Sequence, residues 1–245
     1  MRRATALATL TGLALAPRVA VAAESSLDDM LGRNILSIID ALGMPKTVVS
    51  ENDGHNWSWD RAGSSPLVMI TDDAMTVKAI VVLHPQTPGE RLANVSLFRC
   101  TKARADAERG APDFSGPNFR VYRLSEDRVL ELLFDDGGNL TEAIYGARGH
   151  VARLGLVPAD REMLRVLQYS APKVGRTPLS APVGPPVIVR CEIGKNGRVD
   201  AVSVVVSSHN ASQDKLAVAY ARKVPWFPAK FDNVPVKSVA FWMVQ

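Results

Sequence analysis

The chain of 245 residues has few of the side chains that most often build metal and catalytic centres. It contains two cysteines and four histidines, and the histidines are scattered along the sequence. A metal site of the zinc type needs several such ligands at close spacing, so the sequence predicts no metal site. The chain also lacks a P-loop, a dinucleotide-binding turn and a G-x-S-x-G nucleophile motif. We therefore expect no cofactor and no enzymatic activity.

Long hydrophobic runs are absent from the chain after the N-terminal segment. No stretch in that later part approaches the ~20 apolar residues of a membrane span. The segment itself has two arginines at positions 2–3, an apolar run over 4–16 and small residues at positions 20, 22 and 23. These are the three parts of a secretory signal peptide, here residues 1–23. The alternative, a retained membrane anchor, has an apolar run that Pro17 and Arg18 cut short. We expect a periplasmic protein secreted through a cleaved signal.

No charge of either sign dominates the predicted mature chain. The full sequence carries 29 basic and 25 acidic residues, a formal net charge of +4. Three of the basic residues and none of the acidic ones lie in residues 1–23, which leaves 26 against 25. A nearly neutral chain has no general attraction to nucleic acid, so no nucleic-acid partner is expected.

The two cysteines belong to different parts of the sequence. Cys191 lies in the alternating stretch "VIVRCEI" and is predicted to be a small core residue. Cys100 lies far upstream, in another predicted unit. A periplasmic location permits disulfides. The sequence leaves open whether Cys100 and Cys191 are free or bridged.

A proline-rich stretch, residues 170–186, divides the chain. Its five prolines and two glycines favour an extended connection. We therefore predict a linker there, an N-terminal domain over residues 25–169 and a C-terminal domain over residues 187–245.

The N-terminal domain shows an internal similarity with a period of about 65 residues. Each copy predicts a helix ended by glycine and proline, followed by three strands. The helices are expected over residues 27–42 and 101–109, and Gly43 and Gly110 follow them. The predicted fold class is α+β, with two helix-plus-three-strand repeats.

Acidic and aromatic pairs in this domain allow two interpretations. Asp72–Asp73 and Asp135–Asp136 each lie between apolar runs, which is typical of hairpin turns. Trp57 and Trp59 would share one face of a strand and cover a core. The alternative is a hydrolase of envelope polymers that uses these residues. A second catalytic interpretation, a nucleophile in Ser207-Ser208-His209, lacks the usual motif.

The C-terminal domain is predicted from three local signals. "PVIVRCEI" and "VDAVSVVVSS" are apolar, β-branched runs joined by a turn containing Asn196-Gly197. Asn210 or Ser212 can cap a helix that ends at Pro225. A last strand follows over about residues 236–244. The order strand–strand–helix–strand predicts a small antiparallel sheet covered by one helix.

This order, together with particular residues, resembles the C-terminal domain of TonB, the energy transducer of bacterial outer-membrane import. The matching features are Gly197–Val199 after the turn, Ser207–Ser208, Asp214 near the helix start and Trp226–Ala229 before the closing strand. The resemblance covers about residues 180–245. The N-terminal part resembles no family in this way.

The resemblance implies a site. In that family the final strand pairs with a short segment of a transporter, by strand addition. The corresponding residues here are Val236, Lys237, Ser238, Val239, Ala240, Phe241, Trp242 and Met243. The implied partner is an envelope or outer-membrane protein, and the competing use of the same edge is a homodimer.

Three functions follow in order of preference. The first is a periplasmic binding or scaffold protein that recognises an extended peptide strand of a transport partner. The second is a membrane-anchored energy transducer of the TonB type. The third is the envelope-polymer hydrolase.

Overall fold

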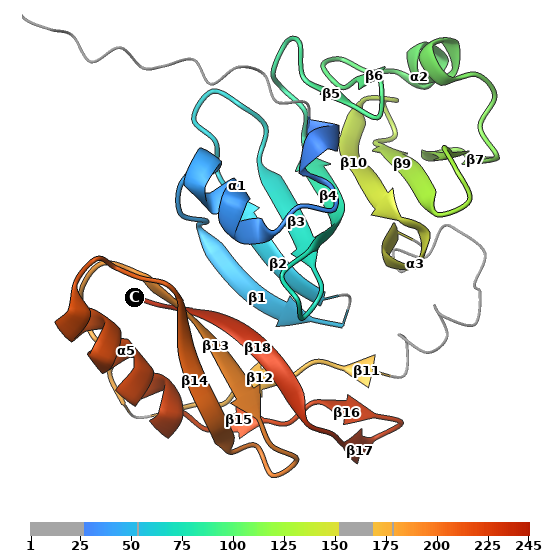
Figure 1. Cartoon of the computed structure of the whole chain (residues 1–245). Coiled ribbons are helices and arrows are strands. Elements are labelled where there is room, and N and C mark those ends of the chain that lie inside the picture. The colour runs from blue at the N-terminus through green and yellow to red at the C-terminus, as the bar shows by residue number, and fades with distance from the viewer. Residues whose placement is uncertain (1–26, 53, 152–168, 178) are drawn as a thin grey trace, which may run out of the picture.

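The computed structural model describes residues 27–52, 54–151, 169–177 and 179–245 (Figure 1). The predicted signal peptide, residues 1–23, lies outside these ranges. The described chain is an α+β protein built mainly from antiparallel sheets, as predicted. Among the described helices, none has the length and apolar character needed to cross a membrane.

The N-terminal unit is built on one large sheet. Its first half comprises η1 (Leu27–Met30), α1 (Ile35–Leu42), β1 (Thr47–Glu51), β2 (Gly54–Trp59), β3 (Leu67–Thr71) and β4 (Val77–Leu83). Its second half comprises β5 (Arg91–Leu92), β6 (Val95–Ser96), α2 (Lys102–Arg109), β7 (Phe114–Gly116), β8 (Phe119–Arg123), β9 (Arg128–Phe134), β10 (Leu140–Ala147) and α3 (Arg148–Val151). Eight strands pair in the order β1-β2-β3-β4-β10-β9-β8-β7.

The two halves of this sheet have the same order of elements. Each runs from a helix into four antiparallel strands, and the halves meet where β4 pairs with β10. The predicted count of three strands per copy missed β1 and β7, which precede the predicted strands. The two acidic pairs lie in the turns between β3 and β4 and between β9 and β10, as expected. The equivalence of the two copies stays a prediction.

The first predicted helix, residues 27–42, was wrong as a single element. Gly32 has a φ of 82° and its N–H donates to the Val77 carbonyl, so the chain leaves the helical path there. A new helix, α1, then starts after Asn34, whose side chain accepts the Leu36 N–H at 2.9 Å. The predicted stop is confirmed: Gly43 follows α1 with a φ of 81°, a region that favours glycine.

The two tryptophans of β2 are core residues, as expected. Trp57 and Trp59 are 0% and 4% exposed and belong to the hydrophobic cluster beneath α1. Each indole N–H is satisfied: Trp57 donates to Thr71 Oγ1 and Trp59 to the Gly43 carbonyl, both at 2.9 Å. Pairing the polar tip of each ring fixes the position of β2 against β3 and against the end of α1.

The opposite face of the large sheet carries a buried carboxyl group. Glu131 of β9 lies opposite Val121 of β8 and Ile144 of β10, and it is completely buried. Neither of its side-chain oxygens has a hydrogen-bond partner among the described residues. Burial, followed by the nearby charge of Glu142, raises the pKa of Glu131 to about 7. The folded protein therefore favours the neutral acid.

We expect Glu131→Gln to remove a pH dependence of stability. Folding raises the pKa of Glu131, so the neutral carboxyl group contributes its full stabilisation of the folded state when the pH is below 4.5, the pKa in the unfolded chain. The stability is lost as the pH rises toward 7. The wild-type free energy of unfolding should fall over this window, relative to the variant, by up to about 3 kcal/mol. Urea unfolding at several pH values measures this, with exposed Glu126→Gln as the control. Parallel pH profiles for wild type and Glu131→Gln would contradict it.

The C-terminal unit has a smaller sheet. Its elements are β11 (Tyr169–Ser170), β12 (Lys173–Val174), β13 (Val187–Ile193), β14 (Val199–Val206), α5 (Ala211–Lys223), β15 (Trp226–Phe227), β16 (Lys230–Phe231), β17 (Val234–Pro235) and β18 (Ser238–Val244). Three strands pair in the order β14-β13-β18, and α5 packs on β13 and β14. The predicted strand–strand–helix–strand order is therefore confirmed, with short strands added around it.

The proline-rich segment is partly paired with the C-terminal unit. Lys173–Val174 pairs with Trp226–Phe227, and the Ala171 N–H donates to Asn52 Oδ1 at 3.0 Å. Val183, further along, is 98% exposed. The domain boundaries stay a prediction. The first residues of the proline-rich segment contact both units.

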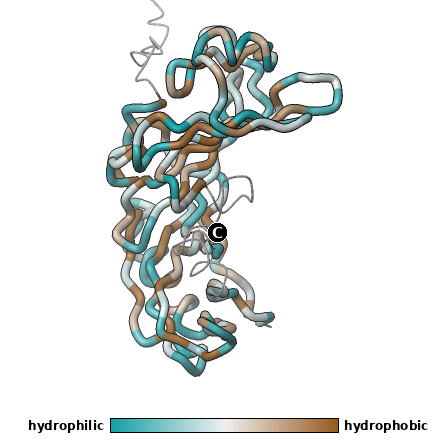
Figure 2. Tube along the Cα trace, turned by 90° about the vertical axis from the view of Figure 1, so that its right-hand side faces the viewer, coloured by the Kyte–Doolittle hydropathy of each residue, from teal (hydrophilic) through white to brown (hydrophobic). Residues whose placement is uncertain are grey.

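The two units share one hydrophobic cluster. Ile188 and Phe241 of the small sheet belong to the same buried cluster as Trp57 and the α1 residues. Figure 2 shows the units one above the other, with hydrophobic residues along the strands of both. The α5 helix covers the other face of the small sheet, so this sheet is packed on both sides.

We expect limited proteolysis to cut the exposed part of the proline-rich segment without separating the units. Arg176 and Val183 are both exposed, so trypsin and elastase should cut at these two positions first. The two fragments should co-elute in size-exclusion chromatography, because Phe241 and Ile188 hold them through buried apolar contacts. First cuts at Ala171 or Lys173, or fragments that elute separately, would show that this packing does not hold in solution.

Candidate functional site

The C-terminal sheet is the candidate site because it has two edges where a further strand can pair. The central strand, β13, bonds to β14 on one side and β18 on the other. The turn between β13 and β14 needs its glycine: Gly197 has a φ of 76°, and a Cβ there would lie 2.1 Å from the Trp226 carbonyl oxygen. The turn is thereby packed against the segment that follows α5.

The helix that covers this sheet is fixed at both ends. The Asn210 side chain accepts the N–H groups of Ser212 and Gln213, which confirms the predicted cap. Pro225 follows its last residue, Lys223, by two positions. The position of α5 over β13 and β14 therefore follows from local sequence signals.

The predicted edge residues lie in and just before β18. Val236 is half-buried and its N–H donates to the Ala229 carbonyl at 2.9 Å, while Lys237 is exposed with its Nζ 3.8 Å from Asp200 Oδ2. The remaining six residues, 238–243, lie within β18, and two of them, Ala240 and Phe241, are buried. The structure therefore brings the predicted residues together on one strand.

The outer edge of β18 faces the N-terminal unit. The Phe241 N–H donates to Ser50 Oγ of β1 at 3.2 Å, so it points away from β13. Backbone groups alternate along an antiparallel strand. Val239 and Met243 therefore also direct their N–H groups outward, whereas Ala240 bonds to β13. Strand β1 lies beside this edge.

The side chains of β18 divide between the two units. Phe241 is 1% exposed, with its ring 4.6 Å from the His55 ring and 5.5 Å from that of Trp57. On the other face, Trp242 packs against Tyr220 of α5 and Trp226. The strand is thus the connection between both cores.

A polar chain at this junction was missed by the sequence reasoning. Ser50 Oγ lies 2.9 Å from His55 Nδ1, and His55 Nε2 lies 2.8 Å from Asp73 Oδ1. The partners fit a serine hydroxyl that donates to Nδ1 and an Nε2–H that donates to Asp73. One signal was available: His55 is two residues from Trp57, so both side chains had to face the same side of β2.

A serine, a histidine and an aspartate in contact also form the catalytic triad of hydrolases. Here the Ser50 oxygen accepts the Phe241 N–H, and the Phe241 ring packs edge-on against the imidazole. The last strand of the protein therefore covers the serine, and the chain of hydrogen bonds joins the two units.

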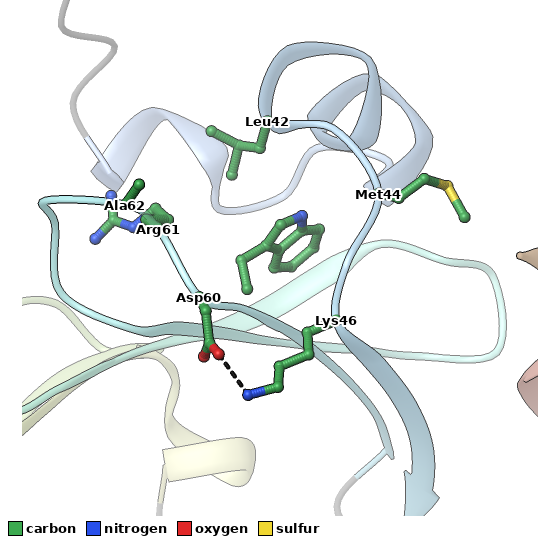
Figure 3. Close-up of a pocket in the computed structure, with 7 residues that line it drawn as sticks. Leu42, Met44, Lys46, Asp60, Arg61 and Ala62 are labelled. Atoms are coloured by element: carbon green, nitrogen blue, oxygen red, sulfur yellow. Dashed lines mark hydrogen bonds and ion pairs between the residues drawn. The ribbon is translucent and has the colours of Figure 1, made fainter. Parts of the chain in front are cut away.

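The other hydrolase features are not gathered in one place. Figure 3 shows a hollow of about 580 Å³ beside the end of α1, lined by Leu42, Met44, Lys46, Trp59, Asp60, Arg61 and Ala62. Lys46 and Asp60 form an exposed ion pair there. Neither Trp57 nor the two acidic turns line this hollow.

The carboxylates of Asp72 and Asp135 accept hydrogen bonds from backbone N–H groups of their own turns. Burial alone would raise the pKa of Asp72, but the Thr76 N–H and the Lys78 ammonium outweigh it and lower that pKa. The Asn139 backbone N–H and side chain lower the pKa of Asp135. Both carboxylates therefore stabilise hairpin turns, as expected.

Ser207 and Ser208 are also structural. Their hydroxyls donate to the two carboxylate oxygens of Asp214 at 2.6 and 2.7 Å. These hydrogen bonds, that of Ser207 first, lower the pKa of Asp214. The neighbouring His209 N–H donates to Ser207 Oγ. The pair thus holds the loop onto the start of α5.

No group of three or more potential metal ligands is found in the described ranges. Cys100 and Cys191 are both buried and free. Burial raises the pKa of Cys100 to about 11 and that of Cys191 to about 12, so both remain protonated thiols at neutral pH. They are core residues of separate units.

Residues 185–241 match the family model described as the C-terminal region of the Gram-negative bacterial TonB protein. This finding confirms the resemblance for the C-terminal unit. The family is one of non-enzymatic protein-interaction domains associated with the envelope. A comparison with curated proteins found no match.

Three solved structures show weak similarity. An extracellular protein containing a SCP domain from Bacillus anthracis has 10% identity and a TM-score of 0.45, covering 66% of this chain and 59% of that one. A cysteine-rich secretory protein from Staphylococcus aureus has 9% identity and a TM-score of 0.43, and the match covers 57% of this chain and 52% of that one. A DUF4309 family protein from Bacillus subtilis has 15% identity and a TM-score of 0.35, and the match covers 47% of this chain and 78% of that one.

Phe241→Ala should destabilise the whole protein. The ring fills a site shared by both units, so its removal leaves a cavity that costs about 3–5 kcal/mol. Phe227→Ala is the matched control, because Phe227 is 66% exposed and Phe241 is 1% exposed. Thermal unfolding measures both. Equal, small shifts in Tm for the two variants would show that Phe241 does not join the units.

Proposed function

We propose that this is a non-enzymatic periplasmic binding or scaffold protein whose C-terminal unit recognises an extended polypeptide segment of an envelope partner. The observation that supports this most is the three-stranded sheet of a TonB-type unit, in which the strand at each edge has one partner and lacks a second in its own sheet. Strand addition to such an edge uses backbone hydrogen bonds for affinity and alternate side chains for selectivity.

The predicted docking strand is β18, with residues 236–243. Two outward N–H groups, those of Val239 and Met243, are directed at the side where a partner strand would pair. The third, that of Phe241, is bonded to Ser50 of β1. A segment that pairs along the full length of β18 must therefore displace β1 from this edge.

The displacement gives the N-terminal unit a role in the proposal. Ser50, His55 and Asp73 hold the β18 edge through one backbone hydrogen bond and the packing of Phe241. A net hydrogen bond of this kind contributes roughly 0.5–1.5 kcal/mol. The hydrogen bond alone is weak enough to be replaced by a strand that makes more than one backbone bond to β18, while the Phe241 ring stays packed against His55 and Trp57.

The partner class follows from the family. We propose an outer-membrane transport protein or another envelope protein that presents a short extended segment to the periplasm. A homodimer through β18 would use the same outward N–H groups. Periplasmic location is supported by the envelope association of the family.

Val239→Pro should weaken binding of peptides taken from periplasm-facing termini of outer-membrane transporters. Proline removes one outward donor while leaving the ladder between β13 and β18 intact, whereas Ala240→Pro would break a bond to Cys191 within the sheet. Ser50→Ala should instead strengthen binding, because it releases the Phe241 N–H. Calorimetric titration of the full chain measures both.

Val239→Thr is the control, since it keeps the backbone N–H and the branched shape. Unchanged affinity in a Val239→Pro variant with a wild-type circular dichroism spectrum would exclude β18 as the docking strand. Light scattering of the free chain separates peptide binding from dimerisation through the same edge.

A further inference from the structure

The second edge of the C-terminal sheet, β14, differs from β18 in being open. Strand β1 lies beside β18, but the only elements with extensive contacts to β14 in the described ranges are β13 and α5. Val204 is 37% exposed, and Ala201 and Ser203 are exposed as well. In the described ranges, no other strand pairs with this edge of β14.

The backbone of β14 offers a regular stretch for pairing. The outward direction of the Phe241 N–H means that its partner Arg190 bonds toward β14, where it faces Ser203. By alternation, Ser203 bonds inward and the N–H and C=O groups of Val202 and Val204 point to the open edge. The register shifts lie on either side of residues 201–204.

This stretch lacks the features that usually protect an edge. Within residues 201–204, Ala-Val-Ser-Val, there is no proline, no lysine and no inward-pointing charge. The nearest acid on the strand, Asp200, lies 3.8 Å from Lys237. The stretch is therefore suited to pairing with another polypeptide.

A groove runs beside this edge and determines which side chains would fit. Its volume is about 500 Å³, and its apolar floor comes from Val204 of β14 and from Val218 and Ala219 of α5. A strand added to β14 would direct every second side chain into this groove, against α5.

The rim of the groove is positively charged. Lys215, Arg222 and Lys223 line it, all are exposed, and none has an ion-pair partner among the described residues. The one acid in the lining, Asp214, is already bonded to two serine hydroxyls. The groove thus has an excess of positive charge beside an apolar floor.

We propose that β14 and this groove form a second docking surface, which takes an extended segment of a partner protein with alternating acidic and small apolar side chains. This inference builds on the proposed binding function but places the recognition on the opposite edge. Backbone bonds to Val202 and Val204 hold the segment. Its acidic side chains enter the groove, where their stems lie on the apolar floor and their carboxylates reach Lys215 and Arg222, and the alternate small side chains lie on the opposite face of the sheet. A second copy of this chain fits less well, because pairing two β14 edges brings two cation-rich α5 helices together.

The test uses the full chain and two synthetic peptides, one in which glutamate alternates with valine or threonine, and one in which lysine replaces glutamate. We expect the acidic peptide to bind, with an affinity that falls as salt is raised, and the basic peptide to bind at least about tenfold more weakly. Val204→Pro should weaken the acidic peptide about tenfold or more, since it removes an outward donor and spares the ladder to β13. Val204→Thr, which keeps that donor, should bind within about threefold of wild type.

Lys215→Glu with Arg222→Glu provides an independent arm, because both side chains are exposed and their reversal does not touch the core. It should abolish the preference for the acidic peptide even if Val204→Pro fails to fold. The inference is overturned if neither peptide binds, if the two bind equally, or if the folded Val204→Pro variant binds as wild type does. A dimer in light scattering that is lost in Val204→Pro would overturn it in favour of a second copy.

The same measurements separate this inference from the β18 proposal. Transporter peptides that lose affinity with Val239→Pro but not with Val204→Pro would support the proposed function, whatever the result for the acidic peptide. The acidic peptide responding to Val204→Pro alone would support β14 as the docking edge.

Discussion

The burial of Phe241 is the contact on which the arrangement of this protein depends. Its ring packs against His55 and Trp57 of the N-terminal unit, while its backbone belongs to the last strand of the C-terminal sheet. One residue therefore fixes the position of β18 relative to β1 and covers Ser50. Strand β18 is therefore partly occupied by the protein itself, whereas β14, on the other side of β13, is an open edge.

Local signals in the sequence were enough to predict most of the C-terminal unit. The Asn196-Gly197 turn, the Asn210 cap and Pro225 each act within a few residues, so they could be read without a structure. The final strand was also found, because alternation of side chains is a local pattern. Which residues of that strand bond to β13 depends on register, so the sequence alone could not show that Val239 directs its N–H outward while Ala240 bonds to β13.

The parts that sequence reasoning missed depend on distant residues. Strand β1 carries only five residues, and its place at the sheet edge was not predicted, although the hairpin signal Asp53-Gly54 follows it. The break in the first helix arises because Gly32 bonds to Val77, forty-five positions away in the chain. The Ser50–His55–Asp73 chain depends on the register of β1 with β2 and of β2 with β3, which pairs Ser50 with His55 and His55 with Thr71. The positive rim and the apolar floor of the groove beside β14 likewise form only when α5 packs on the sheet.

The bond between Ser50 and Phe241 also has a consequence for biosynthesis. Its two residues are 191 positions apart, so the contact cannot form until nearly the whole chain has been made. The large sheet contains only earlier residues and can form first, since domains generally fold as units during synthesis. Closing so long a loop late makes the joining of the two units a slow, non-local step. During this interval the edges of β1 and β13 are both unpaired, and it is then that the nascent protein is most exposed to wrong strand pairing.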